Sequence, residues 1–166
     1  MGVAPEAVGR GYDRDQSAGY LVTLASRLFA AQLRDRLADL KVTPAQVPII
    51  LWLADRDGLT QKDLCARAFI EQPSAAEMLS RMERMGLVTR TRDPDDGRRF
   101  RYHLTAWTRD RVDALKADAA AGNRAALAGI PEDRIETFLS VLHQVIDNLA
   151  PEDRASAPSR PGRRAA

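Results

Sequence analysis

Cysteine is almost missing from this chain, which has a single one, Cys65, among 166 residues. One cysteine excludes an internal disulfide framework and fits the reducing cytoplasm. Long apolar runs are missing too. None approaches the ~18 residues that a membrane-spanning helix needs, and the segment from Met1 to Asp15 has no apolar stretch of the signal-peptide type. We therefore expect a cytoplasmic protein that does not bind a membrane.

The signatures of enzymes and metal sites are also missing. The chain has no Gly-rich phosphate loop, no nucleophile elbow and, apart from acids in the wing and the tail, no paired-carboxylate motif. Its two histidines, His103 and His143, are far apart in sequence and lack carboxylate or cysteine partners at metal-ligand spacing, so both are interpreted as structural. The sequence therefore predicts no enzyme, no cofactor and no metal site. Cys65 is interpreted as a small core residue in preference to a redox switch.

Charge is nearly balanced over the whole chain but not within it. The formal net charge is +2, and the shares of charged residues (29%) and apolar residues (45%) are ordinary for a globular protein. Between Arg81 and Arg101, however, seven arginines stand against four acids. Such a local excess of positive charge is typical of a surface that contacts nucleic acid.

This basic segment belongs to a longer stretch, residues 59–105, whose pattern predicts a winged helix-turn-helix. A first helix opens at Thr60, with Asp63 three residues later as in a capping box. Gln72 and Pro73 supply the cap and the first-turn proline of a second helix, which takes the position of a recognition helix. Gly86 ends this helix, and its apolar positions recur at helical spacing: Ala75, Leu79, Met82 and Met85.

Two segments with alternating polarity follow, residues 87–92 and 100–104, and predict a pair of strands. The connection from Asp93 to Arg99 is too long for a two-residue hairpin turn. We interpret this loop as the wing.

Helices are expected on both sides of the winged domain. Apolar stripes predict a helix over residues 17–40 and a second over residues 43–54, in which Pro48 loosens the first turns. After the wing, Thr105 is expected to cap a long helix. Residues 132–149 then predict a final, strongly amphipathic helix.

The predicted fold is mainly α with a small β-hairpin, a winged helix-turn-helix domain plus a helical dimerisation region formed by the N- and C-terminal helices. The apolar stripe of the last helix, from Ile135 to Leu149, is too extensive to face water in a monomer, so a homodimer is expected. The expected parts are a flexible N-terminal arm, a dimerisation region in two segments, a DNA-binding domain and a disordered tail, at residues 1–16, 17–41 with 106–150, 42–105 and 151–166.

From Leu21 to about Leu149 the chain resembles the MarR-type family of bacterial transcriptional regulators. The resemblance rests on the order and spacing of six stretches: Val42 to Gln46, Leu59 to Leu64, Glu71 to Ser74, Arg81 to Val88, Arg92 to Arg98, and Leu104 with Thr105. It implies a homodimer whose terminal helices intertwine and whose winged domains bind a pseudo-palindromic operator. Two positions depart from the family pattern. Thr108 stands where a glycine is usual, and Glu77 stands where many relatives have a basic or neutral polar residue.

Several side chains are candidates for DNA contact. Arg81 is expected to bind a guanine edge or a phosphate, and Glu77 to accept from a cytosine amino group. The resemblance assigns Asp96 to shaping the wing and Arg98 to entering a minor groove; for Asp96 an ordinary turn residue is the alternative. For the helix, a solvated polar face is the alternative. The predicted DNA-binding residues are Thr60, Gln61, Gln72, Ser74, Ala75, Glu77, Arg81, Arg84, Asp96, Arg98 and Arg99.

A crevice between the dimer body and the winged domain is the candidate effector site. Many members of the family respond to small anions or phenolic compounds, and the resemblance places effectors in this region. The predicted lining residues are Leu28, Val47, Leu51, Trp52 and Trp107, with simple core packing as the alternative for the tryptophans.

The sequence thus predicts a sequence-specific DNA-binding regulator, a repressor whose partners are duplex DNA, a second copy of itself and a small aromatic or phenolic effector. Two alternatives stay open. One is a winged-helix protein-interaction module without operator binding, and the other is a redox-responsive regulator that uses Cys65.

Overall fold

The computed structural model describes residues 12–150. These residues form seven α-helices, three strands and three short 3-10 turns. The α-helices are α1 (Ala18–Arg36), α2 (Val47–Asp55), α3 (Gln61–Ala68), α4 (Gln72–Arg84), α5 (Ala106–Arg109), α6 (Val112–Ala126) and α7 (Glu132–Leu149). The strands are β1 (Leu59–Thr60), β2 (Val88–Arg92) and β3 (Phe100–Leu104), and the 3-10 turns are Arg14–Gln16, Ala38–Leu40 and Pro44–Gln46.

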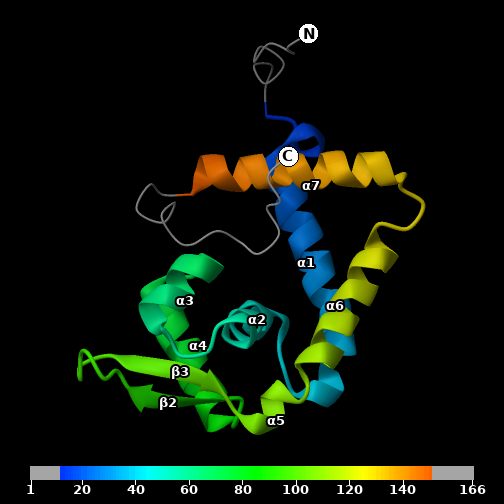
Figure 1. Ribbon diagram of the computed structural model, residues 1–166. Coiled ribbons are helices and arrows are strands. Elements are labelled where there is room, and N and C mark those ends of the chain that lie inside the picture. The colour runs from blue at the N-terminus through cyan, green and yellow to red at the C-terminus, as the bar shows by residue number, and fades with distance from the viewer. Residues whose placement is uncertain (1–11, 151–166) are drawn as a thin grey trace.

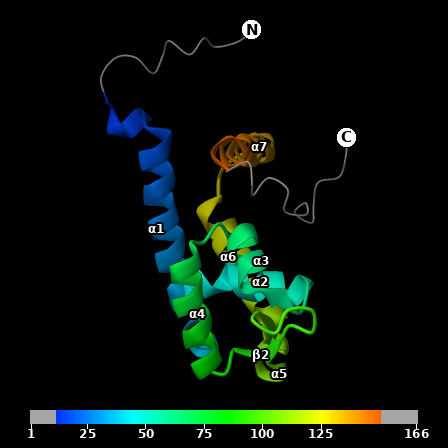
Figure 2. The same ribbon diagram turned by 90° about the vertical axis from the view of Figure 1, so that its left-hand side faces the viewer.

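The elements divide into a winged part and a helical body (Figure 1). Helices α2, α3 and α4 gather beside the sheet, while α1 and α6 pack against each other in the body. Helix α7 lies across the far end of the body, away from the sheet, in both Figure 1 and Figure 2. No helix among residues 12–150 is long and apolar enough to cross a membrane.

Helix α3 begins as its sequence predicts. The Thr60 side chain accepts from the amide of Asp63 at 3.2 Å, and the Asp63 carboxylate accepts from the amide of Thr60 at 3.0 Å. The two side chains thereby satisfy two amides that the first turn of a helix leaves without partners. The predicted capping box is confirmed.

Helix α4 begins one residue earlier than expected, because Glu71 is its N-cap and Gln72 its first helical residue. Its C-terminus is closed by Gly86, whose φ of 70° lies in the left-handed region that glycine adopts without strain. The amides of Gly86 and Leu87 then reach back to the carbonyls of Glu83 and Met82, at 3.0 and 2.9 Å. These bonds stop α4 where the sequence predicts.

The core of the winged part is built on α4 and the sheet. Leu79 and Met82 of α4 are fully buried with Leu64 of α3 and Leu53 of α2. Burial of each large apolar side chain contributes roughly 1.5–3 kcal/mol, so this cluster holds the three helices together. Met85 is a correction to the predicted apolar stripe. It follows the last helical residue as the C-cap and is 41% exposed.

The sheet has one strand more than the predicted hairpin. Its order is β1-β3-β2, with both pairs antiparallel. In the register, Val88 lies opposite Leu104 and Arg92 opposite Phe100, while Leu59 of β1 lies opposite Tyr102. A strand of two residues is too short to show alternation, so only the fold of the chain identifies β1.

Three predicted helices are interrupted. The helix expected over residues 17–40 ends at Arg36 and continues as the 3-10 turn Ala38–Leu40. The helix expected from residue 43 starts with the 3-10 turn Pro44–Gln46, and Pro48 sits in the first turn of α2, where its missing N–H is tolerated. The long helix expected after Thr105 is broken at Asp110 and Arg111 into α5 and α6.

The two ends of the chain meet the expectations only in part. Within the predicted N-terminal arm, Asp13 caps the 3-10 turn Arg14–Gln16, so this part of the arm has regular structure. The predictions for residues 1–11 and for the tail from residue 151 lie outside the described residues.

Helices α1 and α7 have no buried residue. In α7, Phe138 is 50% exposed and Leu139 44%, and in α1, Leu28 is 63% exposed. Their apolar stripes therefore face outward in the single chain. Exposure of large hydrophobic side chains to water is energetically unfavourable.

Candidate nucleic-acid interface

A groove separates the wing from the N-terminal ends of α3 and α4. It has a cavity volume of about 290 Å³ and is lined by Thr60, Gln61, Lys62, Gln72, Arg98, Arg99, Phe100 and Tyr102. Five of these residues were predicted from sequence to contact DNA: Thr60, Gln61, Gln72, Arg98 and Arg99. Helix starts, which carry partial positive charge, and the two wing arginines thus share one surface.

Gln61 and Gln72 connect the two helix starts. The Gln61 side-chain amide donates to the backbone carbonyl of Gln72 at 3.1 Å and to its side-chain oxygen at 2.9 Å. The pair fixes the start of α4 against the start of α3. The Thr60 hydroxyl is already bonded to the Asp63 carboxylate at 2.7 Å, so its first role is the cap of α3.

The outward face of α4 carries the predicted polar stripe. Ser74, Glu77, Arg81 and Arg84 are all exposed, and Arg84 makes a long contact of 3.4 Å with the Ser80 hydroxyl. Among the described residues, neither Glu77 nor Arg81 has an ion-pair partner. Ala75 is a correction: it is fully buried, because it lies on the core face with Leu79 and Met82, and cannot reach DNA.

The tip of the wing is shaped by Asp96, as predicted. Its side chain accepts from the amide of Arg98 at 3.1 Å and pairs with the guanidinium groups of Arg98 and Arg99 at 3.4 and 3.1 Å. The Arg98 side chain is nevertheless 94% exposed, against 64% for Arg99. The wing therefore presents Arg98 to its surroundings more fully than Arg99.

The base of the wing is held by a pair that sequence analysis missed. Arg101 contacts Asp93 at 3.2 Å and the carbonyl of Gly58 at 3.4 Å. The amide of Asp95 and, despite opposing burial, the Arg101 guanidinium hold the pKa of the Asp93 carboxyl below its usual range. Asp93 therefore stays ionised at neutral pH and keeps its grip on Arg101.

Two further arginines of the hairpin are also engaged in structure. Arg90 pairs with Glu83 of α4 at 3.2 Å and lies 4.5 Å from the centre of the Phe100 ring. Arg92 lies 5.9 Å from the same ring and donates to the carbonyl of Gly97 at 3.0 Å. The arginine count in the sequence therefore overstates the charge that the hairpin offers to a ligand.

His103 belongs to a network on the opposite face of the sheet. Its Nδ1 lies 3.0 Å from the Asp57 carboxylate and its Nε2 lies 3.0 Å from the Thr91 hydroxyl. Asp57 also accepts from Arg109 at 3.2 Å. Partial burial raises the pKa of Asp57, but the bonds and charges of His103 and Arg109 outweigh it and leave the pKa lowered. His103 is structural, as predicted, although its carboxylate partner was not foreseen.

Cys65 and His143 were the other residues considered for redox or metal chemistry. Cys65 is 2% exposed in the core, which agrees with its interpretation as a core residue. His143 is exposed on α7. Within residues 12–150, no group of three potential metal ligands comes together.

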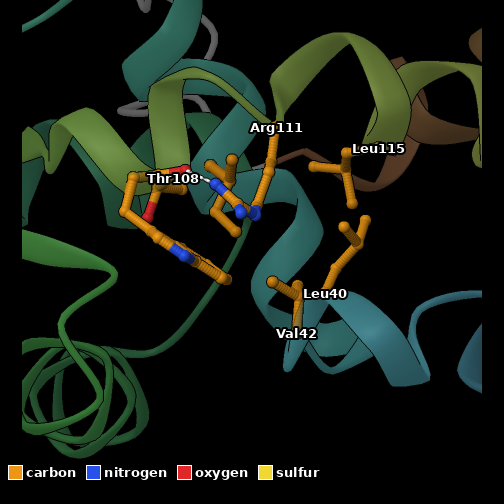
Figure 3. A pocket seen from close by; sticks show the side chains of 7 residues that line it. Leu40, Val42, Thr108, Arg111 and Leu115 are labelled. Atoms are coloured by element: carbon orange, nitrogen blue, oxygen red, sulfur yellow. Dashed lines mark hydrogen bonds between the residues drawn. The ribbon is translucent and has the colours of Figure 1, made fainter.

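The predicted effector crevice does not form as expected. Trp107 lines a small hollow, with a cavity volume of about 10 Å³, together with Leu40, Val42, Ile50, Thr108, Arg111 and Leu115 (Figure 3). None of Leu28, Val47, Leu51 and Trp52 lines it. Trp52 instead lies under the Arg67 guanidinium, 4.9 Å from it, and Val47 is a core residue. The two tryptophans are therefore not part of one pocket in the single chain.

Comparison with known proteins bears on this arrangement. Residues 40–99 match the model of the MarR family. The winged segment of the chain is therefore similar to this family. Its members are named as transcriptional regulators, and the winged helix-turn-helix is a DNA-binding fold.

Curated relatives of this chain include the transcriptional regulator TtmR of Methylorubrum extorquens, which is 28% identical over 81% of this chain and 68% of its own length. The transcriptional regulator HosA of Escherichia coli is 41% identical over 46% of this chain and 55% of its own length. Matches to the first four curated relatives span between 55% and 68% of those proteins.

Solved structures of similar fold include two regulators. The repressor CouR, bound to a 23-mer DNA duplex, has a TM-score of 0.72 with 24% identity, and the match covers 82% of this chain and 99% of CouR. BpsR of Bordetella bronchiseptica, whose DNA binding is regulated by 6-hydroxynicotinic acid, has a TM-score of 0.76 with 21% identity, over 83% of this chain and 99% of BpsR. The mainly helical winged fold is thus shared.

Proposed function

We propose that this protein is a homodimeric, sequence-specific DNA-binding regulator that represses transcription from a pseudo-palindromic operator in the cytoplasm. The observation that carries the proposal is the surface made by the groove and the exposed face of α4. Helix starts, unpaired Arg81 and Glu77, and the 94% exposed Arg98 all lie on it. Such a surface combines base-reading side chains with phosphate-binding groups.

The contacts divide by kind. Arg81 and Glu77 lie on α4 with free polar ends, so we assign them to base edges in a major groove, with Ser74 at the helix start on a phosphate. Arg98 projects from a loop that Asp96 shapes, so we assign it to the neighbouring minor groove or its phosphates. CouR, whose fold is similar, was solved on duplex DNA. The interaction-module alternative has no comparable observation in its favour.

The two arginines are expected to behave differently when removed. Arg98→Ala weakens binding to operator and random DNA alike, because phosphate neutralisation does not depend on sequence. Arg81→Ala erodes discrimination between operator and random DNA by about 1–3 kcal/mol if its contact to a base is bidentate. Gel shifts at several salt concentrations measure both effects, with Arg34→Ala on α1 as a control. If both variants bind every DNA with the affinity of the parent, the interaction-module alternative is favoured.

Dimerisation is proposed through α1 and α7. Helix α7 has 18 residues and none is buried, although one face carries Ile135, Phe138, Leu139, Leu142, Val145, Ile146 and Leu149. A face of this kind needs a cover, and the outward apolar residues of α1 in a second copy provide one. An interface shared by two identical copies is the usual closed arrangement.

A charge on this face is expected to break the dimer. Leu139→Asp places a carboxylate on the apolar face, whereas Ser140→Asp places the same group on the opposite face of α7. Sedimentation is expected to report a dimer for the parent and for Ser140→Asp, and monomer or aggregate for Leu139→Asp. A well-folded monomeric parent at micromolar concentration contradicts the proposal.

A small aromatic anion is proposed to modulate DNA binding at the Trp107 hollow. Arg111 lies 4.0 Å from the Trp107 ring centre, so a positive charge and an aromatic face stand together. The hollow joins α5 and α6 to the segment around Leu40 and Val42, so a ligand that widens it contacts both the winged part and the body. About 1.4 kcal/mol of differential binding between two arrangements changes operator affinity tenfold. The redox alternative has no such support, because Cys65 is buried.

Tryptophan fluorescence can distinguish a ligand bound at Trp107 from one bound at Trp52. A hydroxybenzoate is expected to quench emission of the parent and of Trp52→Phe and to release operator DNA from both. Trp107→Phe, which still binds operator, is expected to lose both responses. Quenching and release that persist in Trp107→Phe would place the effector elsewhere.

A further inference from the structure

Helix α5 is a single turn that joins the wing to the helical body. It starts directly after β3, ends at Arg109 and is followed by α6, which packs along α1 (Figure 1). The orientation of α5 therefore bears on how the winged part sits against the body.

Two threonines of this turn bind the end of the recognition helix. The Thr108 hydroxyl donates to the carbonyl of Leu87 at 2.8 Å, and the Thr105 hydroxyl donates to the carbonyl of Gly86 at 2.8 Å. The amide of Thr105 also donates to the Leu87 carbonyl, at 3.2 Å. We call this set of contacts the threonine clasp.

The two hydroxyl groups of the clasp also contact each other. Their oxygens lie 3.0 Å apart, and either hydroxyl can donate to the other. The Thr105 oxygen in turn accepts from the amide of Thr108 at 3.3 Å, as the N-cap of α5. Thr108 is 3% exposed, so its bond to the Leu87 carbonyl lies in the interior of the fold.

The clasp contacts the turn that closes the C-terminus of α4, and hydrogen bonds hold this turn in place. Gly86 and Leu87 return their amides to the last turn of α4, so their carbonyls are fixed relative to that helix. On the other side, Thr108 is followed after three residues by the start of α6. One buried hydroxyl thus bridges the recognition helix and the connection to the body.

We propose that Thr108 is a positioning residue for DNA binding: its hydroxyl holds α4 at the angle and spacing that two copies of the helix need to enter one duplex together. The inference rests on the proposed function of α4. A free dimer whose α4 helices sample other angles binds with an affinity lowered by the fraction that is not competent.

The decisive variant is Thr108→Val, which keeps the shape of the side chain and removes the hydroxyl. Loss of a single neutral hydrogen bond is expected to weaken operator binding by about three- to tenfold. Thr108→Ser keeps the hydroxyl and is expected to bind like the parent. Ile49→Val, which removes a buried methyl group from α2, controls for a general loss of stability. All four proteins are compared well below their unfolding temperatures.

Hydrogen exchange provides a readout that needs no DNA. In Thr108→Val, the amides of Met85, Gly86, Leu87 and Thr105 are expected to exchange faster, while those of α3 keep the rates of the parent. Faster exchange with weaker binding, both restored in Thr108→Ser, supports the proposal. Operator affinity of Thr108→Val equal to that of the parent overturns it. Weak operator binding by Thr108→Ser also overturns it. The proposal is likewise overturned if the operator affinity of Ile49→Val falls in proportion to the loss of stability of that variant.

Failure of the proposed function gives a different result. If the parent binds no duplex DNA, the function is wrong whatever the variants do. Unchanged exchange rates in Thr108→Val would then also overturn the clasp itself.

Discussion

Burial of one face of α4 is the constraint on which the rest of this structure depends. Ala75, Leu79 and Met82 are all fully buried, and their burial fixes the rotation of the helix about its own axis. Because side chains one turn apart share a face, that rotation decides which residues point outward. Glu77 and Arg81 are exposed for this reason, and so is the whole polar stripe that we assign to DNA.

The arginines of the hairpin illustrate how charge is divided between building and binding. Arg90 and Arg101 are paired with Glu83 and Asp93, and they join the wing to α4 and to the loop before β1. Arg98 projects into solvent from a loop that its neighbours hold in shape. Exposed ion pairs contribute little stability, so the wing tip keeps Arg98 available to a stronger anionic partner such as a phosphate.

Local signals in the sequence were sufficient for the elements that carry the proposed site. The cap at Thr60, the glycine at the end of α4 and the alternation of the two wing strands act within a few residues, so they could be read without the fold. Contacts between distant segments could not. Asp57 meets His103 across 46 positions and Arg109 across 52, and neither pairing leaves a periodic trace. The buried position of Thr108 and the break between α5 and α6 are also consequences of packing.

The predicted effector site also did not form as expected, because contacts between distant segments cannot be derived from the sequence. Trp52 and Trp107 are both large and lie near the expected junction, so the sequence placed them together. In the structure, Trp52 packs against Arg67 and Trp107 packs against Arg111. Selection of genomic fragments bound by the purified protein tests whether the dimer reads a symmetric operator. We expect enrichment of a two-fold symmetric motif with half-sites about one helical turn, roughly 10 base pairs, apart. Recovery of no motif, or of one without two-fold symmetry, would contradict it.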